Sequence, residues 1–224
     1  MAVISPDRTV ERELLAQLPA GTYLAGVDEV GRGSIAGPAS VGIALVNTDT
    51  VDEFPVGLRD SKMISAHVRE SLVEPVHEWV SAYAVGHASP QDVNEAGILG
   101  ALRIAAARAL EQLDGFEIAG VLLDGSHDWW SSDGLFDAGA TLPVLPVRME
   151  VKGDARCAVV AAASVLAKVE RDRIMVESAE AFPGYGFERN KGYASAEHIH
   201  GLETLGASAF HRTAWKLPGI GHTK

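Results

Sequence analysis

The sequence contains little cysteine and no long apolar run. Its one cysteine, Cys157, excludes an internal disulfide and any cysteine-rich zinc site. The surrounding ARCAVVAAASV is typical of a small thiol buried in a core. No apolar stretch reaches the roughly 18 residues that a membrane helix needs, and the charges within MAVISPDRTVERELL disfavour a secretion signal. We therefore expect a cytoplasmic protein with no membrane partner.

Positive charge is also scarce, since 19 basic residues stand against 30 acidic ones and the net charge is -11. This balance argues against a plain nucleic-acid binder, because phosphate contacts need lysine and arginine. The charge is uneven, however. Residues 182–224 carry a net +2 and four of the eight histidines, which leaves -13 on the other 181 residues. A partner that touches only one face of the molecule remains compatible with this pattern.

The 224 residues are 47% hydrophobic and 22% charged, which is typical of a globular chain of one domain, or of one domain with an appendage. The apolar spacing predicts strands at 22–30, 38–47, 81–89, 117–125 and 142–150. It predicts helices at 5–18 (capped by Ser5, with Pro6 in its first turn), 64–80 (kinked at Pro75), 89–115 (between Ser89 and Gly115), 154–178 and 195–206.

Strands that alternate with long helices predict an α/β fold, with a five-stranded mixed sheet covered by helices on both faces. We expect the first two strands to pair antiparallel. The two prolines of segment 142–150 suit only an edge strand. In such sheets, ligands gather at the carboxyl ends of central strands.

Four acidic residues are predicted at that end of the sheet. Asp28 and Glu29 close the first strand, Asp124 closes the fourth, and Asp154 precedes a long helix. If the first and fourth strands are parallel neighbours, the acids converge and their repulsion requires cations. Oxygen ligands without cysteine or clustered histidine select Mg²⁺ or Mn²⁺ over Zn²⁺. Two such ions can clamp the attacking and leaving oxygens of a phosphodiester.

Each acid also has a simpler interpretation. Asp154 could be only a helix N-cap, and Asp124 could be only the first residue of an Asp-Gly turn. Asp28 and Glu29 are adjacent, so their side chains should point to opposite faces of the strand. Both can reach one site only if the strand twists or ends there, or if one residue contributes its backbone carbonyl.

The segment GRGSIA at 31–36 matches the dinucleotide-binding fingerprint. That fingerprint requires a helix next, whereas Pro38 and a strand-like run follow, and the two acids before it would repel a pyrophosphate. The better interpretation is that Gly31 and Gly33 let backbone N–H groups and Arg32 approach a nucleic-acid strand closely.

Several separated motifs together resemble ribonuclease HII, the type 2 ribonuclease H. The resemblance covers about residues 22 to 213, and it leaves out the first 20 residues and the end beyond about 215. The motifs, in order, are AGVDEVGRGSIAGP (25–38), LRDSK (58–62), LLDG (122–125), VKGDARCAVVAAASVLAKVERDRIM (151–175), GYGFERNKGYASAEHIHGL (184–202) and, more loosely, HRTAW (211–215).

The resemblance implies a ribonuclease H-like fold with a small helical C-terminal part, divided as 1–20, 21–180 and 181–224. It implies hydrolysis of the RNA strand of RNA–DNA hybrids and cleavage 5′ to single ribonucleotides in duplex DNA. It implies two Mg²⁺ or Mn²⁺ ions as cofactors, and products with 3′-hydroxyl and 5′-phosphate ends. The resemblance makes Asp28, Glu29, Asp124 and Asp154 the catalytic and metal-binding acids.

For substrate binding, the resemblance implies Gly31, Arg32 and Gly33, together with Tyr193, which packs at the RNA–DNA junction. Ala194-Ser195 follows this tyrosine where the family commonly has Gly-Thr. The expected partners are hybrids and ribonucleotide-containing DNA, bound by a monomer. Basic residues near the motifs are further candidates for phosphate contact, namely Lys62, Lys152, Lys168 and Arg171.

Three other functions remain open from the residues alone. The glycine motif allows a nucleotide-binding oxidoreductase. A nucleic-acid binding module without chemistry would tolerate chelation of metals. A metal-dependent DNA nuclease or transposase-like enzyme of the same fold would cut DNA that lacks ribonucleotides.

Overall fold

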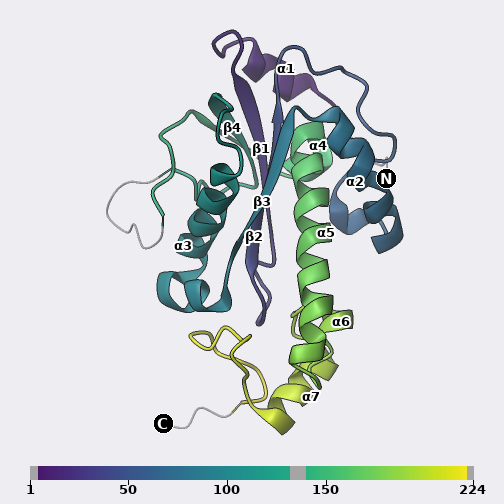
Figure 1. Cartoon of the computed structure of the whole chain (residues 1–224), viewed down its shortest axis with the longest axis vertical. Coiled ribbons are helices and arrows are strands. Elements are labelled where there is room, and N and C mark those ends of the chain that lie inside the picture. Colours follow the sequence, from purple (N-terminus) through teal and green to yellow (C-terminus); the bar gives the residue numbers. More distant parts are fainter. Residues whose placement is uncertain (1–4, 132–139, 221–224) are drawn as a thin grey trace.

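The computed structural model describes residues 5–131 and 140–220. Residues 182–224 are called the tail below, and Lys224, which contributes to the charge of the tail, lies outside the described residues. Five strands and the helices around them confirm the predicted mixed α/β fold (Figure 1). The elements are α1 (Thr9–Leu15), β1 (Tyr23–Val30), β2 (Ala39–Val46), the 3-10 turn η1 (Ser61–Met63), α2 (Ala66–Trp79), β3 (Ala82–Ala88), α3 (Pro90–Glu111), β4 (Ile118–Asp124), β5 (Val147–Glu150), α4 (Gly153–Arg156), α5 (Ala158–Ala181), α6 (Phe187–Asn190) and α7 (Ala196–Leu205).

The sheet has the strand order β3-β2-β1-β4-β5. β1 pairs antiparallel with β2, and β2 with β3, whereas β1–β4 and β4–β5 are parallel pairs. The predicted antiparallel start and the edge position of the fifth strand are confirmed, and the first and fourth strands meet the condition of parallel pairing. As a result, the carboxyl ends of β1, β4 and β5 meet at one edge of the sheet. The fifth strand begins at Val147 rather than near Leu142, so both prolines of segment 142–150 lie before it.

Helices cover both faces of the sheet, with α5 on one side and α3 on the other (Figure 1). The contact with α5 is very close at β2, where a Cβ on Gly42 would lie 2.4 Å from the carbonyl oxygen of Ala163. Strand alternation places Leu24 among the residues packed under α5, and Ala25 and Val27 among those packed under α3. This alternation continues into the acids at the end of β1.

The N-terminal segment changes two of the predicted helices. α1 begins at Thr9 rather than near Ser5, and the carboxylate of Asp7 accepts the Thr9 N–H. The helix predicted over 154–178 is divided into α4 and α5 at Cys157, whose backbone is extended. The break has a clear cause, because Asp7 pairs with the backbone beside Cys157, donating to Arg156 and accepting from Ala158.

The other helices differ in smaller ways. α2 continues through Pro75, with Ser65 as its cap. α3 has the predicted cap at Ser89, which forms a capping box with Asp92. It ends at Glu111 rather than near Gly115, and it is interrupted at Gly97, whose φ of 68° is not helical.

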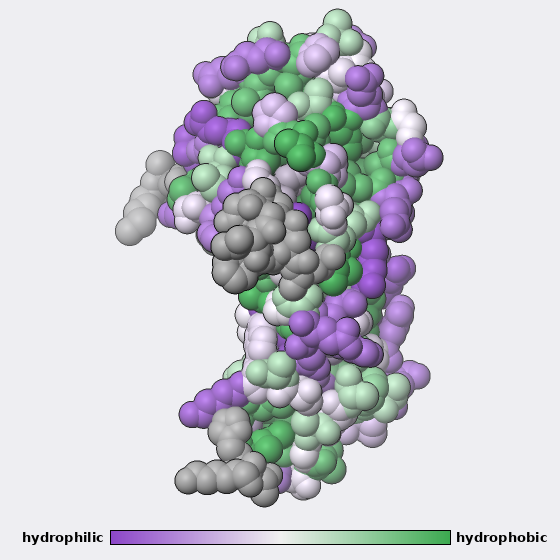
Figure 2. Space-filling view, turned by 90° about the vertical axis from the view of Figure 1, so that its left-hand side faces the viewer, coloured by the Kyte–Doolittle hydropathy of each residue, from purple (hydrophilic) through white to green (hydrophobic). Residues whose placement is uncertain are grey.

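The tail packs at the far end of α5, where α6 and α7 lie beyond the end of the sheet (Figure 1). A separate apolar cluster holds it together, joining Tyr185, Phe187 and Leu202 of the tail to Ile35 and Met175. On the face drawn in Figure 2, apolar residues (green) gather over the upper, sheet-containing part of the molecule. The predicted division at residues 20 and 180 stays a prediction.

None of the helices within residues 5–131 and 140–220 is both long enough and apolar enough to cross a membrane.

Candidate active site

The parallel strands bring the four predicted acids to one edge of the sheet. Asp28 and Glu29 are near the end of β1, Asp124 is the last residue of β4, and Asp154 lies in α4 just after β5. The backbone N–H of Asp154 donates to Oδ1 of Asp124 at 3.4 Å. Asp154 is not an N-cap, because Lys152 caps α4 and Cys157 caps α5.

Asp28 points to the α5 side of the sheet and is 3% exposed. Burial raises its pKa well above the ordinary value, and the charge of Asp124 raises it further. Ser164 of α5 and Lys62 oppose this shift by favouring the ionised carboxylate. The fold alone therefore disfavours the ionised form of Asp28.

Lys62 lies among the three aspartates of the site. Its Nζ is 3.2 Å from Oδ2 of Asp154. Burial alone would lower the pKa of Lys62, but the charges of Asp28 and Asp154 outweigh burial and raise it. The pKa values of Asp124 and Asp154 are also raised, in each case chiefly by burial, and next by Asp124 in the case of Asp154. One lysine thus faces at least three carboxyl groups.

Glu29 arrives from the opposite, α3 side of the sheet. Nε1 of Trp129 lies 3.3 Å from its Oε2, and a guanidinium nitrogen of Arg32 lies 3.2 Å from its Oε1. Its charge still raises the pKa of both Asp28 and Asp124. The expected conflict between neighbouring side chains on a strand is therefore real, because β1 continues to Val30 and Glu29 is still within the strand.

Within residues 5–131 and 140–220, no three histidine, cysteine, aspartate or glutamate side chains already stand in a geometry that would hold a metal ion. The donor set nevertheless fits a hard divalent cation, because it consists of carboxylate oxygens. Burial and neighbouring carboxylates raise the pKa values of Asp28, Asp124 and Asp154. A divalent ion would remove the repulsion that Lys62 relieves only in part.

The glycine loop after β1, residues 31–33, packs against a buried arginine. Gly31 has a φ of 80°, and a Cβ there would lie 2.1 Å from Nε of Arg171. Arg171 is fully buried and donates to the carbonyl of Pro38 and the hydroxyl of Ser34. It was a candidate for phosphate contact, and that expectation is wrong, because its guanidinium is enclosed by the loop. Gly33, in contrast, has open space where a Cβ would be.

A second fully buried arginine, Arg212 of the tail, donates to the carbonyl oxygens of Arg32 and Gly37. In the described part of the chain, neither Arg171 nor Arg212 forms an ion pair with a carboxylate. Burial, and next the charge of Arg171, lower the pKa of Arg212 to about 9. Two buried positive charges therefore fix the loop between β1 and the tail.

Tyr193 lies against the same loop. Its ring centroid is 5.6 Å from the guanidinium carbon of Arg171, and the residue is 40% exposed. Its carbonyl oxygen lies 3.0 Å from Nδ1 of His198, a buried residue of α7. The structure thus brings Tyr193 and the loop of Gly31, Arg32 and Gly33 together through shared supports.

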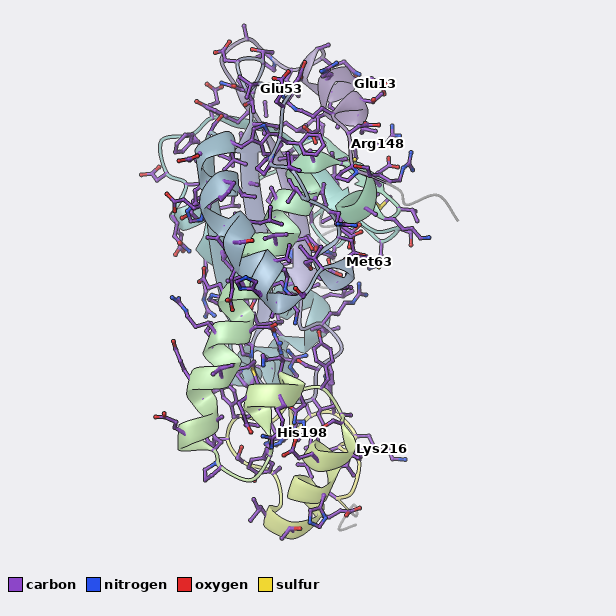
Figure 3. All side chains as sticks on the ribbon, turned by 90° about the vertical axis from the view of Figure 1, so that its right-hand side faces the viewer. Glu13, Glu53, Met63, Arg148, His198 and Lys216 are labelled. Carbon is purple, nitrogen blue, oxygen red and sulfur yellow. The ribbon has the colours of Figure 1, made fainter. Side chains whose placement is uncertain are left out.

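The remaining basic candidates are placed differently. Lys168 forms an ion pair with Asp172 at 2.6 Å and is largely covered. Lys152 is exposed and has a left-handed backbone, with a φ of 59°. Met63, which follows Lys62, lies on the face between β5, marked by Arg148, and the tail, marked by His198 (Figure 3). A substrate on this face could contact both the acids and the tail.

Two supports of the site were missed from the sequence. Trp129 follows the LLDG motif closely, and its polar indole was a usable signal. Ser164 donates to Ser61, beside Lys62, at 2.9 Å. Nothing in the sequence pattern marks this pair, because serines are common within alanine-rich helices.

Comparison with known proteins gives a consistent result. The sequence model of the family described as "Ribonuclease HII" matches residues 25–218. The chain is 43% identical over 223 residues to the ribonuclease HII of Streptomyces avermitilis, covering 98% of this chain and 89% of that one.

Solved structures show the same similarity. The ribonuclease H2 of Pyrococcus horikoshii OT3 superposes with a TM-score of 0.68 at 25% identity, covering 87% of this chain and 94% of that one. The Archaeoglobus fulgidus RNase HII, solved in a complex with PCNA, gives a TM-score of 0.68 at 26% identity, covering 89% and 98%. The ribonuclease H-like fold expected from the motifs is confirmed.

Proposed function

Because this chain belongs to the ribonuclease HII family of endoribonucleases, which cleave RNA in RNA–DNA hybrids, we propose that it also cuts 5′ to single ribonucleotides in duplex DNA. The products are 3′-hydroxyl and 5′-phosphate ends, and the cofactors are two Mg²⁺ or Mn²⁺ ions. The observation that carries this proposal is the arrangement of Asp28, Asp124 and Asp154 around Lys62 at one edge of the sheet.

The acids are the proposed ligands, namely Asp28, Glu29, Asp124 and Asp154. When bound, two divalent ions supply an activated water and stabilise the leaving 3′ oxygen. The carboxylates would hold the two ions in place, since burial and hydrogen bonds orient the carboxylates. Lys62 has a side chain that is 66% exposed, so it is free to turn from Asp154 to a substrate phosphate.

Selection of RNA over DNA requires contact with the 2′-hydroxyl. The backbone of Gly31, Arg32 and Gly33 is proposed to make this contact, which Gly33 supports by leaving open space. Tyr193 is proposed to stack on the sugar of the next nucleotide, which its partial exposure allows. Lys168 is the weaker candidate for phosphate contact, because it would first have to leave Asp172.

We propose that the enzyme works as a monomer in the cytoplasm. All four acids and both supports of the glycine loop come from one chain, so the proposed site needs no residue from a second copy. The oxidoreductase alternative is excluded by the family and by the fold, because strand β2 follows the glycine loop where a dinucleotide site needs a helix.

One assay tests the proposal. Three duplexes are compared, namely a full RNA–DNA hybrid, DNA with one ribonucleotide and plain DNA, each with Mg²⁺, Mn²⁺ or EDTA. We expect cleavage of the first two only, and none in EDTA. Cleavage of plain DNA would favour a DNA nuclease of the same fold, and binding without metal-dependent cleavage would favour a binding module.

A further inference from the structure

Glu29 faces a positioning problem that the other three acids do not share. It lies on the α3 side of β1, as Ala25 and Val27 do, whereas Asp28 is directed toward α5. A side chain that must bend around the end of a strand has several rotamers available. Something on the α3 side has to select one of them if Glu29 is to join the cluster.

Trp129 is the buried group that contacts Glu29 from that side. Its indole N–H donates to Oε2 at 3.3 Å, and the tryptophan is only 3% exposed. The donor is neutral, so it orients the carboxylate without neutralising its charge. An indole N–H can only donate, which makes this hydrogen bond unambiguous.

The other donor to Glu29 is of a different kind. Arg32 has a side chain that is 46% exposed, and it belongs to the loop proposed to contact the substrate. Its hydrogen bond at 3.2 Å is therefore open to solvent and to competition from a phosphate. Of these two donors, Trp129 is the one that its burial shields from such competition.

The backbone around Trp129 is itself firmly held. Arg103 of α3 donates to the carbonyl of Trp130 at 2.6 Å and to that of Trp129 at 3.3 Å. Oδ1 of Asp128 accepts the N–H of Trp130 at 3.0 Å. The contacts with α3 thus fix the loop that carries the indole, and the indole in turn contacts Glu29.

We propose that Trp129 is a positioning residue whose indole N–H fixes the carboxylate of Glu29 for binding a divalent ion. The inference rests on the proposed four-acid metal site. Partners of this kind typically change metal affinity by about 10–100-fold when removed. Because Arg32 also contacts Glu29, we expect the lower part of this range, about 10-fold, for Trp129→Phe.

The chain supplies a matched control one residue away. Trp130 is also buried in the α3-side core, but its indole donates to the carbonyl of Pro143 at 3.2 Å rather than to an acid. Trp130→Phe removes an indole of the same size from the same cluster. It should leave metal affinity unchanged while lowering stability about as much as Trp129→Phe does.

The experiment titrates Mn²⁺ into substrate-free protein and measures binding by calorimetry and by quenching of tryptophan fluorescence. Trp129→Phe should bind Mn²⁺ about 10-fold more weakly, and high Mn²⁺ should restore its kcat on a hybrid. Equal affinity of wild type and Trp129→Phe would overturn the inference alone. Equal weakening by Trp130→Phe would also overturn it, since the effect would then be one of loop packing. No saturable binding by the wild type would instead overturn the proposed metal site.

Discussion

His198 and His211 share a hydrogen bond between their Nε2 atoms, which lie 2.9 Å apart inside the tail. Their other contacts assign the proton. The carbonyl of Tyr193 can only accept, so His198 carries its proton on Nδ1. The N–H of Ser208 can only donate, so His211 accepts at Nδ1 and donates from Nε2. Both rings must be neutral for this arrangement to hold.

This pair predicts a loss of stability in mild acid. Burial, and next the charge of His198, lower the pKa of His211 to about 4, and burial also lowers that of His198. The unfolded chain therefore binds more protons as the pH falls. The stabilisation is complete above about pH 6.5 and is lost progressively toward pH 4, at up to about 1.4 kcal/mol per pH unit for each histidine.

The measurement is urea unfolding between pH 7 and pH 4, compared between variants because other groups also titrate. His211→Gln should show a shallower fall in the free energy of unfolding than the wild type. His200→Gln is the control, since the side chain of His200 is 80% exposed. Parallel profiles for the wild type and His211→Gln would contradict the assignment.

Gly31 and Gly33 should differ sharply in their tolerance of alanine. At Gly31 a Cβ would meet the Arg171 guanidinium in a left-handed backbone, whereas at Gly33 it would meet open space. The left-handed conformation alone costs about 1–2 kcal/mol for a non-glycine residue. Gly31→Ala should lower the Tm by about 4 °C or more, and Gly33→Ala by much less. Differential scanning calorimetry measures both, and an equal shift would show that Arg171 does not constrain the loop.

Glu11 should be essential for stability, although it is not one of the four acids of the proposed site. It is fully buried, its Oε1 accepts the N–H of Val159 at 2.7 Å, and its Oε2 forms an ion pair with Arg8 at 2.8 Å. Glu11→Ala removes this partner but leaves Arg8 its ion pair with Asp52 at 3.3 Å, so the loss should stay below the about 3–5 kcal/mol typical of an uncompensated buried charge. Glu13→Ala is the control, since Glu13 is exposed (Figure 3). Chemical denaturation measures both variants, and similar midpoints would refute the role.

The sequence predicts most of the sheet because strand periodicity is a local property. Each strand is a short segment rich in apolar residues, and the acids mark where β1 and β4 end. The break between α4 and α5 is different. It depends on Asp7 pairing with backbone about 150 residues away, and no pattern around Cys157 reports that contact. Local periodicity therefore predicts one helix where there are two.

The site shows the same limit. The motifs mark the acids, the glycine loop and Tyr193, which are chemically distinctive. The partner of Glu29 was missed, because the choice between Trp129 and Trp130 depends on how α3 packs against the loop. Its positive charge near the motifs makes Arg171 a candidate for phosphate contact in the sequence. Only the fold shows that the carbonyls of a loop enclose it.

Asp124→Asn should separate catalysis from stability. Asp124 is ionised at a cost, since burial and the charge of Glu29 raise its pKa. An asparagine keeps an oxygen for the N–H of Asp154 but removes the negative charge. In EDTA the variant should therefore be at least as stable as the wild type. Its cleavage of a hybrid should fall about 10²–10⁴-fold, since several kcal/mol of stabilisation depend on bound metal.

The two readouts together test the proposed site. Mg²⁺ should raise the Tm of the wild type, because binding to the folded state stabilises it, and it should raise that of Asp124→Asn much less. Asp114→Asn, a change in the turn after α3, is the control and should respond to Mg²⁺ as the wild type does. Normal cleavage by Asp124→Asn would remove Asp124 from the site. A variant that loses cleavage and also unfolds in EDTA would show that the carboxylate serves the fold rather than the metal, because repulsion among the acids predicts the opposite change in stability.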